Sequence, residues 1–427
     1  MNKLPPYRGR ALLFSYDLQC KKATSIRKIN GVLPTLISAK QSGFTSAIIP
    51  EENSKEASYI NGMNIYSFKT LRELAQKFEN NEKLIPIEQM YYSNTNEVQI
   101  NLCEDFCNVK GQRLAKRALE IAAAGGHNVL MSGPPGAGKT MLSRCMPGIL
   151  PPMSFEEALE VTKIHSIAGL LDAKIGIIKT RPFRSPHHTV TIPALAGGGK
   201  NAKPGEISLA HNGVLFLDEL PEYPRHTLET LRQPLEDKVI TVSRSTLTVE
   251  YPANFILIAS MNPCPCGNYG SEDRVCKCSP NQIHNYRNKL SGPLMDRIDL
   301  FVEVDSVKYS ELSDKSISEN SESIRKRVEN ARNIQLQRFR EDCGIYTNSQ
   351  MNSSQIKKYC KIDSDAELMV ELAFKKFNLT ARGFNRILKV ARTVADLENC
   401  ERIDVSHIAE AIQFRNSDKI AGGKSIV

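Results

Sequence analysis

Long apolar runs are missing from this chain of 427 residues, and none approaches the roughly 18 residues that a transmembrane helix needs. The first ten residues, M-N-K-L-P-P-Y-R-G-R, also lack the apolar core of a secretory signal. These absences exclude a membrane-spanning or exported protein from the expected classes. We therefore predict a cytoplasmic protein with no membrane partner.

Acidic residues are the minority, because 47 Asp and Glu stand against 56 Lys and Arg. The net charge of +9 and the pI of about 8.9 permit a nucleic-acid partner without establishing one. Hydrophobic residues make up 41% of the chain, an ordinary share for a globular protein. The length suffices for two or three domains.

The stretch from Val129 to Thr140, V-L-M-S-G-P-P-G-A-G-K-T, joins an apolar run to a glycine-rich loop. The run predicts a buried strand and Met141 to Cys145 a helix, which is the setting of a phosphate-binding loop. Glycines let backbone N–H groups approach phosphate oxygens, and the helix N-terminus adds partial positive charge. Lys139 is expected to reach the β- and γ-phosphates of ATP, and the Thr140 hydroxyl to ligate Mg²⁺. The predicted nucleotide-binding residues are Gly133, Pro134, Pro135, Gly136, Ala137, Gly138, Lys139 and Thr140.

Two further apolar stretches end in polar side chains. Gly213 to Leu217 leads into Asp218 and Glu219, and Phe255 to Met261 leads into Asn262. Ligands of α/β proteins bind at the carboxyl ends of the strands. We expect Asp218 to orient the Mg²⁺ shell and Glu219 to polarise the attacking water.

Six stretches together resemble the Mg-chelatase-related AAA+ ATPases of the YifB/ComM type. They are G-P-P-G-A-G-K-T, R-P-F-R-S-P-H-H-T, P-G-E-I-S-L-A-H-N-G-V-L-F-L-D-E-L, A-S-M-N-P-C-P-C-G, S-G-P-L-M-D-R-I-D-L and R-I-L-K-V-A-R-T-V-A-D-L. The resemblance runs from about residue 100 to the C-terminus. It implies an α/β P-loop AAA+ three-layer sandwich with a C-terminal helical lid, assembled as a homo-oligomeric, hexameric ring. ComM-type members are similar to DNA branch-migration motors that assist recombination in natural transformation.

The resemblance assigns roles to several polar residues. Asn262 takes the sensor position between the carboxylates and the γ-phosphate; its alternative is an ordinary turn asparagine before Pro263. Arg297 takes the place from which an arginine reaches the γ-phosphate of a neighbouring subunit. The alternative role of Arg297 is an ion pair with Asp296 or Asp299 in its own chain.

The lid arginine that senses nucleotide is expected in the segment L-T-A-R-G-F-N-R. The segment from Leu379 to Asp396 is predicted to start a helix, with Thr380 as its N-cap and Arg382 in its first turn. Arg382 is the first candidate and Arg386 the second, with a solvated helical face as the alternative.

Four cysteines fall within 15 residues, in the pattern C-P-C-x9-C-x-C. Cys264, Cys266, Cys276 and Cys278 suit a structural, tetrahedral Zn²⁺ site, although C-x-C is tighter than the usual C-x2-C. A free-thiol loop and redox pairing are the alternatives. In a chain with nucleotide chemistry, cysteines favour the reducing cytosol, where metal ligation is commoner than disulfides.

The N-terminal region is predicted as strands at Ala11 to Tyr16 and Ala47 to Pro50, with helices at Leu33 to Ser42 and Leu71 to Phe78. Part of it, from Asn30 to Asn53, resembles the closing section of a Lon-protease-like α/β domain. That family has a catalytic lysine where Leu33 or Thr35 stands here, and its serine would precede Met1. We therefore expect a partial Lon-like domain without peptidase activity.

The predicted order is a partial Lon-like domain over 1–80, a linker over 81–108, an AAA+ core over 109–305, a connecting helical segment over 306–349 and a helical lid over 350–427. In the resembling proteins the region 181–205 loops into the ring pore. Its cations are Arg181, Arg184, Lys200 and Lys203. At a hairpin near 239–251, Lys238 and Arg244 are expected to touch phosphates at the pore; the alternative is that these lysines and arginines are simply solvated. His187 and His188 are adjacent, not at a ligand spacing, and are interpreted as structural or hydrogen-bonding residues.

The favoured function is an ATP-hydrolysing ring motor that acts on DNA. One alternative is a Mg-chelatase-like motor subunit that remodels a protein partner for metal insertion, and the Lon-like segment argues against it. The other is a nucleotide-switched scaffold, and Glu219, Asn262 and Arg297 argue against that.

Overall fold

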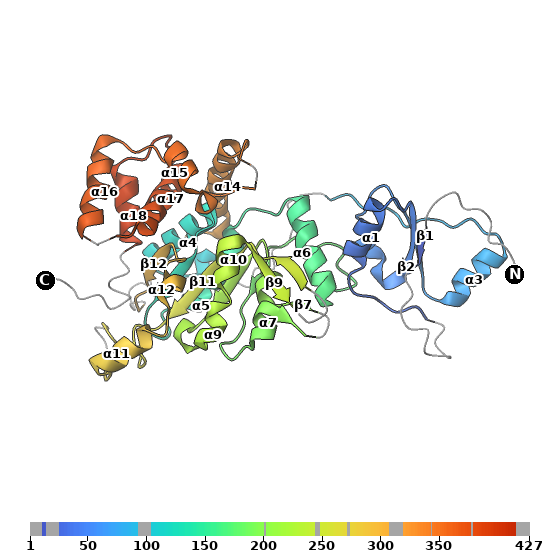
Figure 1. Cartoon of the computed structure of the whole chain (residues 1–427), viewed down its shortest axis with the longest axis horizontal. Helices are drawn as coiled ribbons and strands as arrows, with labels where there is room; N and C mark the ends of the chain where they lie inside the picture. Colours follow the sequence, from blue (N-terminus) through green and yellow to red (C-terminus); the bar gives the residue numbers. More distant parts are fainter. Residues whose placement is uncertain are drawn as a thin grey trace. The chain divides into compact units, whose positions relative to one another are not determined.

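The computed structural model describes residues 25–92, 104–199, 202–243, 248–270, 274–306, 319–342, 344–376 and 379–415, with the backbone of 11–13. The predictions for Lys200 and Arg244 lie outside these residues. The chain folds into two compact units, one of 1–99 with 152–180 and one of 100–151 with 181–427 (Figure 1). The predicted core of 109–305 is thus interrupted, because 152–180 belongs to the first unit. Every helix in the described part of the chain is too short or too polar to span a bilayer.

The first unit is built on a three-stranded parallel sheet of β1 (Ala11–Leu13), β2 (Ser46–Pro50) and β3 (Asn64–Phe68), in that order. Its other elements are α1 (Val32–Gln41), η1 (Glu51–Asn53), α2 (Ser54–Ala57), α3 (Leu71–Glu79) and α6 (Phe155–Ala168). The apolar side of α1 packs against the alternate buried residues of β2 and β3, including Ala47, Ile49 and Ile65. The second predicted strand and both predicted helices are confirmed to within one or two residues.

α6 is joined to the first unit by buried polar groups. Ser166 Oγ donates to Glu56 Oε2 at 2.9 Å, and Asn53 Nδ2 donates to Glu56 Oε1 at 2.5 Å. Glu56 is only 4% exposed, so these hydrogen bonds replace the water that its carboxylate loses on burial. This network explains why residues far along the chain fold with the N-terminal unit.

The second unit contains a five-stranded parallel sheet, with the predicted strands confirmed in its centre. The strand order is β12 (Leu300–Glu303), β4 (Val129–Ser132), β11 (Ile256–Met261), β8 (Val214–Leu217) and β5 (Phe183–Arg184). All residues of β4, β11 and β8 are buried, which is the pattern of parallel strands covered on both faces. Met261 pairs with Ser132, and Ala259 pairs with Leu217. The carboxyl ends of these three strands therefore meet at one edge.

Short elements and helices surround this sheet. Before β5 the unit has η2 (Phe106–Asn108), α4 (Arg113–Gly125) and α5 (Lys139–Ile149), and α5 contains the helix predicted over Met141 to Cys145. After β5 follow α7 (Ile192–Ala196), β6 (Gly197–Gly198), β7 (Lys203–Pro204) and α8 (Glu206–Leu209). The remaining elements are η3 (Leu220–Glu222), α9 (Arg225–Glu229), α10 (Arg232–Asp237), the antiparallel pair β9 (Val239–Ser243) and β10 (Thr248–Pro252), α11 (Pro280–Arg287) and α12 (Gly292–Met295).

The C-terminal part is helical, as predicted, and its helices gather as one group in Figure 1. They are α14 (Ser321–Arg338), η4 (Asn348–Gln350), α15 (Ser353–Tyr359), α16 (Ser364–Lys376), α17 (Ala381–Leu397) and α18 (Val405–Gln413). α17 packs on α4, and α14 packs on both α4 and α5. The helices therefore cover the helix that follows the phosphate-binding loop.

A buried ion-pair network holds these helices together. Asp396 is fully buried and accepts hydrogen bonds from Arg338, from Arg392 Nε at 3.1 Å and from Asn348 Nδ2 at 2.8 Å. Arg392, which is 1% exposed, also donates to the carbonyl oxygens of Cys400 and Glu401. Every charge in the network thus has several partners, which is the condition for burying it.

Replacing Asp396 by leucine should lower the free energy of unfolding by about 3–5 kcal/mol, because Arg392 is left buried without its ion-pair partner. Urea unfolding followed by far-UV circular dichroism measures the loss. The matched control is Glu371→Gln, which removes the carboxylate from the exposed pair with Lys375 on α16 and should leave the midpoint nearly unchanged. Equal midpoints for Asp396→Leu and wild type would contradict the role given to the network.

Candidate functional site

The edge formed by β4, β8 and β11 brings Lys139 to the carboxyl end of the sheet. Lys139 is the first residue of α5, and its Nζ donates to the carbonyl oxygens of Gly133 at 2.5 Å and Pro134 at 2.9 Å. It also donates to Asn262 Oδ1 at 3.3 Å. Burial lowers the pKa of Lys139, while the charges of Asp218 and Glu219 act in the opposite direction. The predicted lysine and the predicted sensor asparagine are therefore neighbours.

Thr140 and Asp218, both predicted to serve Mg²⁺, also meet at this edge. Thr140 Oγ1 donates to Asp218 Oδ2 at 2.9 Å. The other carboxylate oxygen accepts from Ser260 Oγ and from the backbone N–H of Glu219, the latter at 3.0 Å. Ser260 was not identified from the sequence. The one available signal was a hydroxyl in the apolar strand F-I-L-I-A-S-M, two residues before Asn262.

Glu219 lies beside a histidine that the sequence analysis treated as structural or hydrogen-bonding. The carboxylate oxygen Oε2 of Glu219 is 3.5 Å from His188 Nδ1. The backbone of Glu219 has a left-handed φ of 52°. The His188 ring meets the Tyr223 ring edge-on at 6.3 Å, and Tyr223 Oη donates to the Pro186 carbonyl at 2.6 Å. Burial, followed by the charges of Asp218 and Glu219, raises the pKa of Tyr223. His188 is thus held against the predicted catalytic carboxylate.

The loop between β4 and α5 is open above its glycines. Gly136 and Gly138 have φ values of +80° and +87°, and a Cβ at either position would meet no described atom within 4 Å. Binding of a nucleoside triphosphate with Mg²⁺ requires oxygen ligands for the metal, a cation for the phosphates and an open glycine-rich loop. Thr140 and Asp218 supply the oxygens, Lys139 the ammonium group, and Gly136 and Gly138 the open loop. The residues therefore fit ATP and Mg²⁺.

Arg297 occupies a different environment from the one weighed as its alternative. It forms an ion pair with Glu236, and its Nη1 donates to the Pro293 carbonyl at 2.6 Å. The alternative role predicted for Arg297 was an ion pair with Asp296 or Asp299. The ion pair within the chain does exist, but its partner is Glu236. Arg297 Nε is buried and makes no hydrogen bond to any described residue.

The two candidate lid arginines lie in different surroundings. The predicted N-cap is confirmed, since Thr380 Oγ1 accepts from the Gly383 N–H at 3.1 Å, and Arg382 is exposed in the first turn of α17. Arg386 instead donates to the Ile298 carbonyl at 3.0 Å and to Asp299 Oδ1 at 3.1 Å. The second candidate is therefore used in a contact between α17 and the start of β12.

Asp299 is the centre of that contact. His127 Nδ1 lies 3.5 Å from its Oδ2, and the Asn128 N–H donates to the same oxygen at 3.2 Å. Burial alone would raise the pKa of Asp299, but His127, Arg386 and Lys389 together hold it well below its usual range. The negative charge of Asp299 thus links the sheet to the C-terminal helices.

The four predicted metal ligands come together. Their sulfur atoms all lie within 4.8 Å of one another, and Cys264 Sγ is 3.4 Å from Cys266 Sγ and 3.7 Å from Cys276 Sγ. A tetrahedral site with Zn–S bonds of about 2.3 Å needs sulfurs about 3.8 Å apart, close to these distances. Backbone N–H groups of Asn268 and Lys277 lower the pKa of Cys266, whereas burial and the neighbouring thiols raise the pKa of Cys276 and Cys278. The cysteines therefore fit Zn²⁺.

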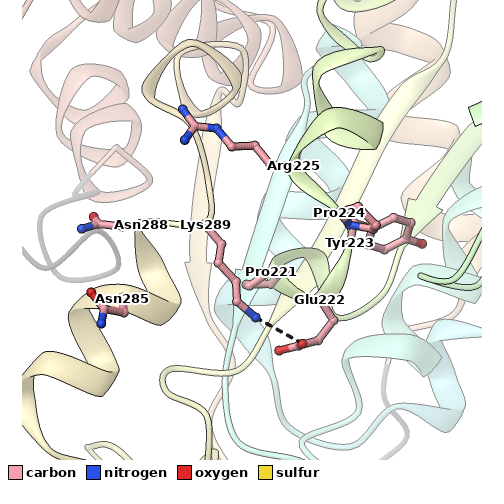
Figure 2. A pocket seen from close by; sticks show the side chains of 8 residues that line it. All are labelled: Pro221, Glu222, Tyr223, Pro224, Arg225, Asn285, Asn288 and Lys289. Atoms are coloured by element: carbon pink, nitrogen blue, oxygen red, sulfur yellow. Dashed lines mark hydrogen bonds and ion pairs between the residues drawn. The ribbon is translucent and has the colours of Figure 1, made fainter.

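A polar cleft of about 590 Å³ opens beside the segment that follows Glu219. Figure 2 shows Lys289, two residues after α11, pointing toward Glu222 of η3, and their Nζ–Oε2 distance is 3.3 Å. The cleft is lined by Pro221, Glu222, Tyr223, Pro224, Arg225, Asn285, Asn288 and Lys289. The ion pair joins the segment after α11 to η3, which directly follows Glu219.

Several cations of the predicted pore region are engaged within the chain. Arg181 donates to the carbonyl oxygens of Pro151 at 2.6 Å and Asn212 at 2.7 Å, and Arg184 forms a two-bond ion pair with Glu206. Lys203 is exposed. Lys238 is partly buried, and burial lowers its pKa. Contact of these cations with DNA remains a prediction.

Comparison with known proteins gives two adjoining family matches. The model for the magnesium chelatase subunit ChlI matches residues 105–312, and the model for the ChlI C-terminal region matches residues 318–415. The chain belongs to the Mg-chelatase ChlI family. This is an AAA+ ATPase family, and the five-stranded parallel sheet followed by C-terminal helices is consistent with it.

Similar individual proteins divide into two groups. The competence protein ComM of Haemophilus influenzae is 40% identical over 404 residues, which is 94% of this chain and 77% of that protein. The uncharacterized protein YifB of Escherichia coli is 39% identical over 93% of this chain and 76% of its own length. The magnesium-chelatase 67 kDa subunit of Heliobacterium mobile is 27% identical over 53% of this chain and 37% of its own length. The suspected YifB/ComM relationship is therefore confirmed.

Ser260→Ala should weaken Mg²⁺-dependent nucleotide binding, because Asp218 loses the hydroxyl that orients it. Loss of such a supporting hydrogen bond typically costs about 10–100-fold in metal affinity. A Mg²⁺ titration of the binding of a fluorescent ATP analogue measures the change. The control is Ser143→Ala, since Ser143 is equally buried but donates to the Lys139 carbonyl instead. Identical Mg²⁺ dependence in Ser260→Ala and wild type would rule out this role.

Proposed function

We propose that this protein is a Mg²⁺-dependent ATPase that works as a ring on DNA. The observation that carries the proposal is the meeting of Lys139, Thr140, Asp218 and Asn262 at one edge of a parallel sheet. Membership of the ChlI family supports ATP hydrolysis. Similarity to a competence protein over 94% of the chain supports a DNA substrate.

Bound ATP and Mg²⁺ would supply the phosphoanhydride bond and the divalent charge that stabilises its cleavage. Lys139 would bind the phosphates with its buried ammonium group, and Thr140 with Asp218 would hold the metal. Glu219 would accept a proton from the attacking water, because its carboxylate is next to Asp218 and partly exposed. Asn262 would orient the water or the terminal phosphate from beside Lys139.

A ring follows if Arg297 acts on the nucleotide of the next subunit. Its buried Nε without a hydrogen-bond partner among the described residues leaves a donor to be satisfied on assembly. We infer that the ion pair with Glu236 is the resting arrangement of the separate chain. Each complete active site would then need two subunits, and a closed homo-oligomer, proposed as a hexamer, provides them. Arg382, exposed on α17, is the proposed lid arginine.

The proposal includes one zinc ion per chain at Cys264, Cys266, Cys276 and Cys278, in a structural role. A chelatase motor subunit is the weaker candidate. The magnesium-chelatase 67 kDa subunit matches only 53% of this chain, whereas ComM matches 94%. The N-terminal unit is proposed to be Lon-like and without peptidase activity, and no step of the mechanism uses it.

Glu219→Gln should bind ATP nearly as tightly as wild type and hydrolyse it about 10²–10⁴-fold more slowly, because it removes a general base and leaves the phosphate contacts. Steady-state phosphate release and equilibrium binding of an ATP analogue measure the two effects. Glu222→Gln, a few residues later and paired with Lys289, should keep near wild-type turnover. Undiminished turnover in Glu219→Gln would sink the assignment.

Arg297→Ala should bind ATP but hydrolyse it about 10³-fold or more slowly, because the precedent for such arginines is 10³–10⁵-fold. Mixing it with Lys139→Ala should restore part of the activity, since some interfaces then join an intact phosphate loop to an intact arginine. Mixing Lys139→Ala with Glu219→Gln is the control and should restore nothing, because both changes lie in the same site. No recovery in the first mixture would mean that Arg297 acts within its own chain.

DNA should stimulate the wild-type ATPase, and added salt should reduce that stimulation as phosphate contacts are screened. The per-chain rate should also rise with protein concentration as rings assemble. ATPase assays with and without DNA, over a range of salt and protein concentrations, test both statements. A rate that does not respond to DNA at low salt would favour a protein partner over DNA.

A further inference from the structure

The cysteine loop, defined here as 264–270 with 274–278, lies directly on the phosphate-binding loop. Gly267 is buried with φ +80°, and a Cβ built on it would lie 2.5 Å from Pro135 Cδ and 2.8 Å from Pro135 Cγ. Only the absence of a side chain at Gly267 allows this approach. Pro135 is in the centre of the sequence that binds phosphate, so the two loops share a surface.

A second connection runs through the chain itself. Cys264 follows Asn262 and Pro263, and Asn262 Oδ1 accepts a hydrogen bond from Lys139 Nζ at 3.3 Å. The cysteine loop therefore reaches the phosphate-binding residues at two points: through Gly267 onto Pro135, and through Asn262 onto Lys139. A change in the shape of the loop must alter one or both contacts.

α11 holds the same loop from the other side. Arg287 donates from Nε and Nη2 to the Pro263 carbonyl at 3.3 Å and 3.2 Å, and its guanidinium lies 5.2 Å from the centre of the Tyr269 ring. The Tyr269 N–H in turn donates to Cys264 Sγ at 3.3 Å. The loop is thus held at its start by α11 and lies against Pro135 in its middle.

The sulfur cluster sets the shape of the loop. The four sulfurs lie within 4.8 Å of one another, and Gly267 immediately follows Cys266. Thiolates at such distances repel one another unless a cation lies between them. Binding of the metal therefore favours the closed loop, and its removal favours a more open one.

We propose that metal binding at the four cysteines is coupled to nucleotide binding at the phosphate loop, through the contact of Gly267 with Pro135. This proposal rests on the proposed ATPase function and on a thiophilic divalent metal of the zinc type. Coupling between sites is reciprocal for binding free energies. Zinc thus tightens nucleotide binding, and nucleotide tightens zinc binding by the same factor.

The test begins with the reduced chain of 427 residues, whose zinc content is measured by elemental analysis. Removing zinc with a chelator should weaken binding of a fluorescent ATP analogue by about 5–150-fold, the usual range for coupled sites, and restoring zinc should reverse the loss. In the reciprocal experiment, a saturating ATP analogue should lower the equilibrium constant for zinc transfer to a chromophoric chelator by the same factor. This second arm measures metal affinity and needs no catalysis.

Two glycine variants locate the coupling. Gly267→Ala should keep about one zinc per chain but bind nucleotide weakly, because its Cβ displaces the loop from Pro135. Gly270→Ala is the matched control: Gly270 has φ +78°, so the backbone strain is alike, but its Cβ would meet no described atom within 4 Å. Gly270→Ala should therefore keep both zinc and nucleotide affinity. The zinc-loaded variants also provide a test if stripping the metal unfolds the wild type.

Three results would overturn the proposed coupling, and they differ in what else they overturn. Fresh reduced protein without zinc overturns both the zinc site and the coupling. Bound zinc with equal nucleotide affinity before and after stripping, or equal affinity in Gly267→Ala and Gly270→Ala, overturns the coupling and leaves the zinc site and the ATPase standing. Failure of every form to bind nucleotide overturns the proposed ATPase together with the coupling.

Discussion

The alignment of three parallel strand ends is the constraint on which the site depends. Because Met261 pairs with Ser132 and Ala259 pairs with Leu217, the residues that follow β4, β8 and β11 emerge at one edge. A shift of one residue in either register would turn each strand's side chains to the opposite face. Lys139 and Asp218 meet their partners only because the register is held by strands that are buried throughout.

The opposite edge of the sheet, at the amino ends of β4 and β12, is connected to the C-terminal helices by a buried charge. Asp299, the residue before β12, accepts from Arg386 of α17 and lies beside His127. His127 Nε2 is 2.8 Å from Thr393 Oγ1, which is also on α17. α14 packs on α5, the helix that begins with Lys139. The helices therefore contact both the strand next to the phosphate-binding loop and the helix that follows it. The helix that begins with Lys139 is thus in direct contact with the C-terminal part.

Local patterns in the sequence were sufficient for the strands, most helices and the position of the phosphate loop, because apolar runs, capping residues and glycine spacing are properties of short segments. The contacts of Ser260 with Asp218 and of His188 with Glu219 were not predicted, because neither residue has a local sequence signal for its carboxylate partner. The partner of Arg297 was also mistaken. Glu236 is 61 residues from Arg297 along the chain, whereas Asp296 and Asp299 lie within two residues of it. Nearness along the chain is a poor guide to ion pairs between elements.

By itself, the sequence determined the chemistry available: a phosphate-binding loop, two carboxylates after one strand, an asparagine after another and four thiols within 15 residues. Only the tertiary structure decided which groups meet. It joined residues 152–180 to the N-terminal unit, brought His188 to Glu219 and placed Gly267 on Pro135. The physical reason is that composition and spacing act over one element, whereas strand register, buried polar partners and close backbone approaches arise only when separate elements pack.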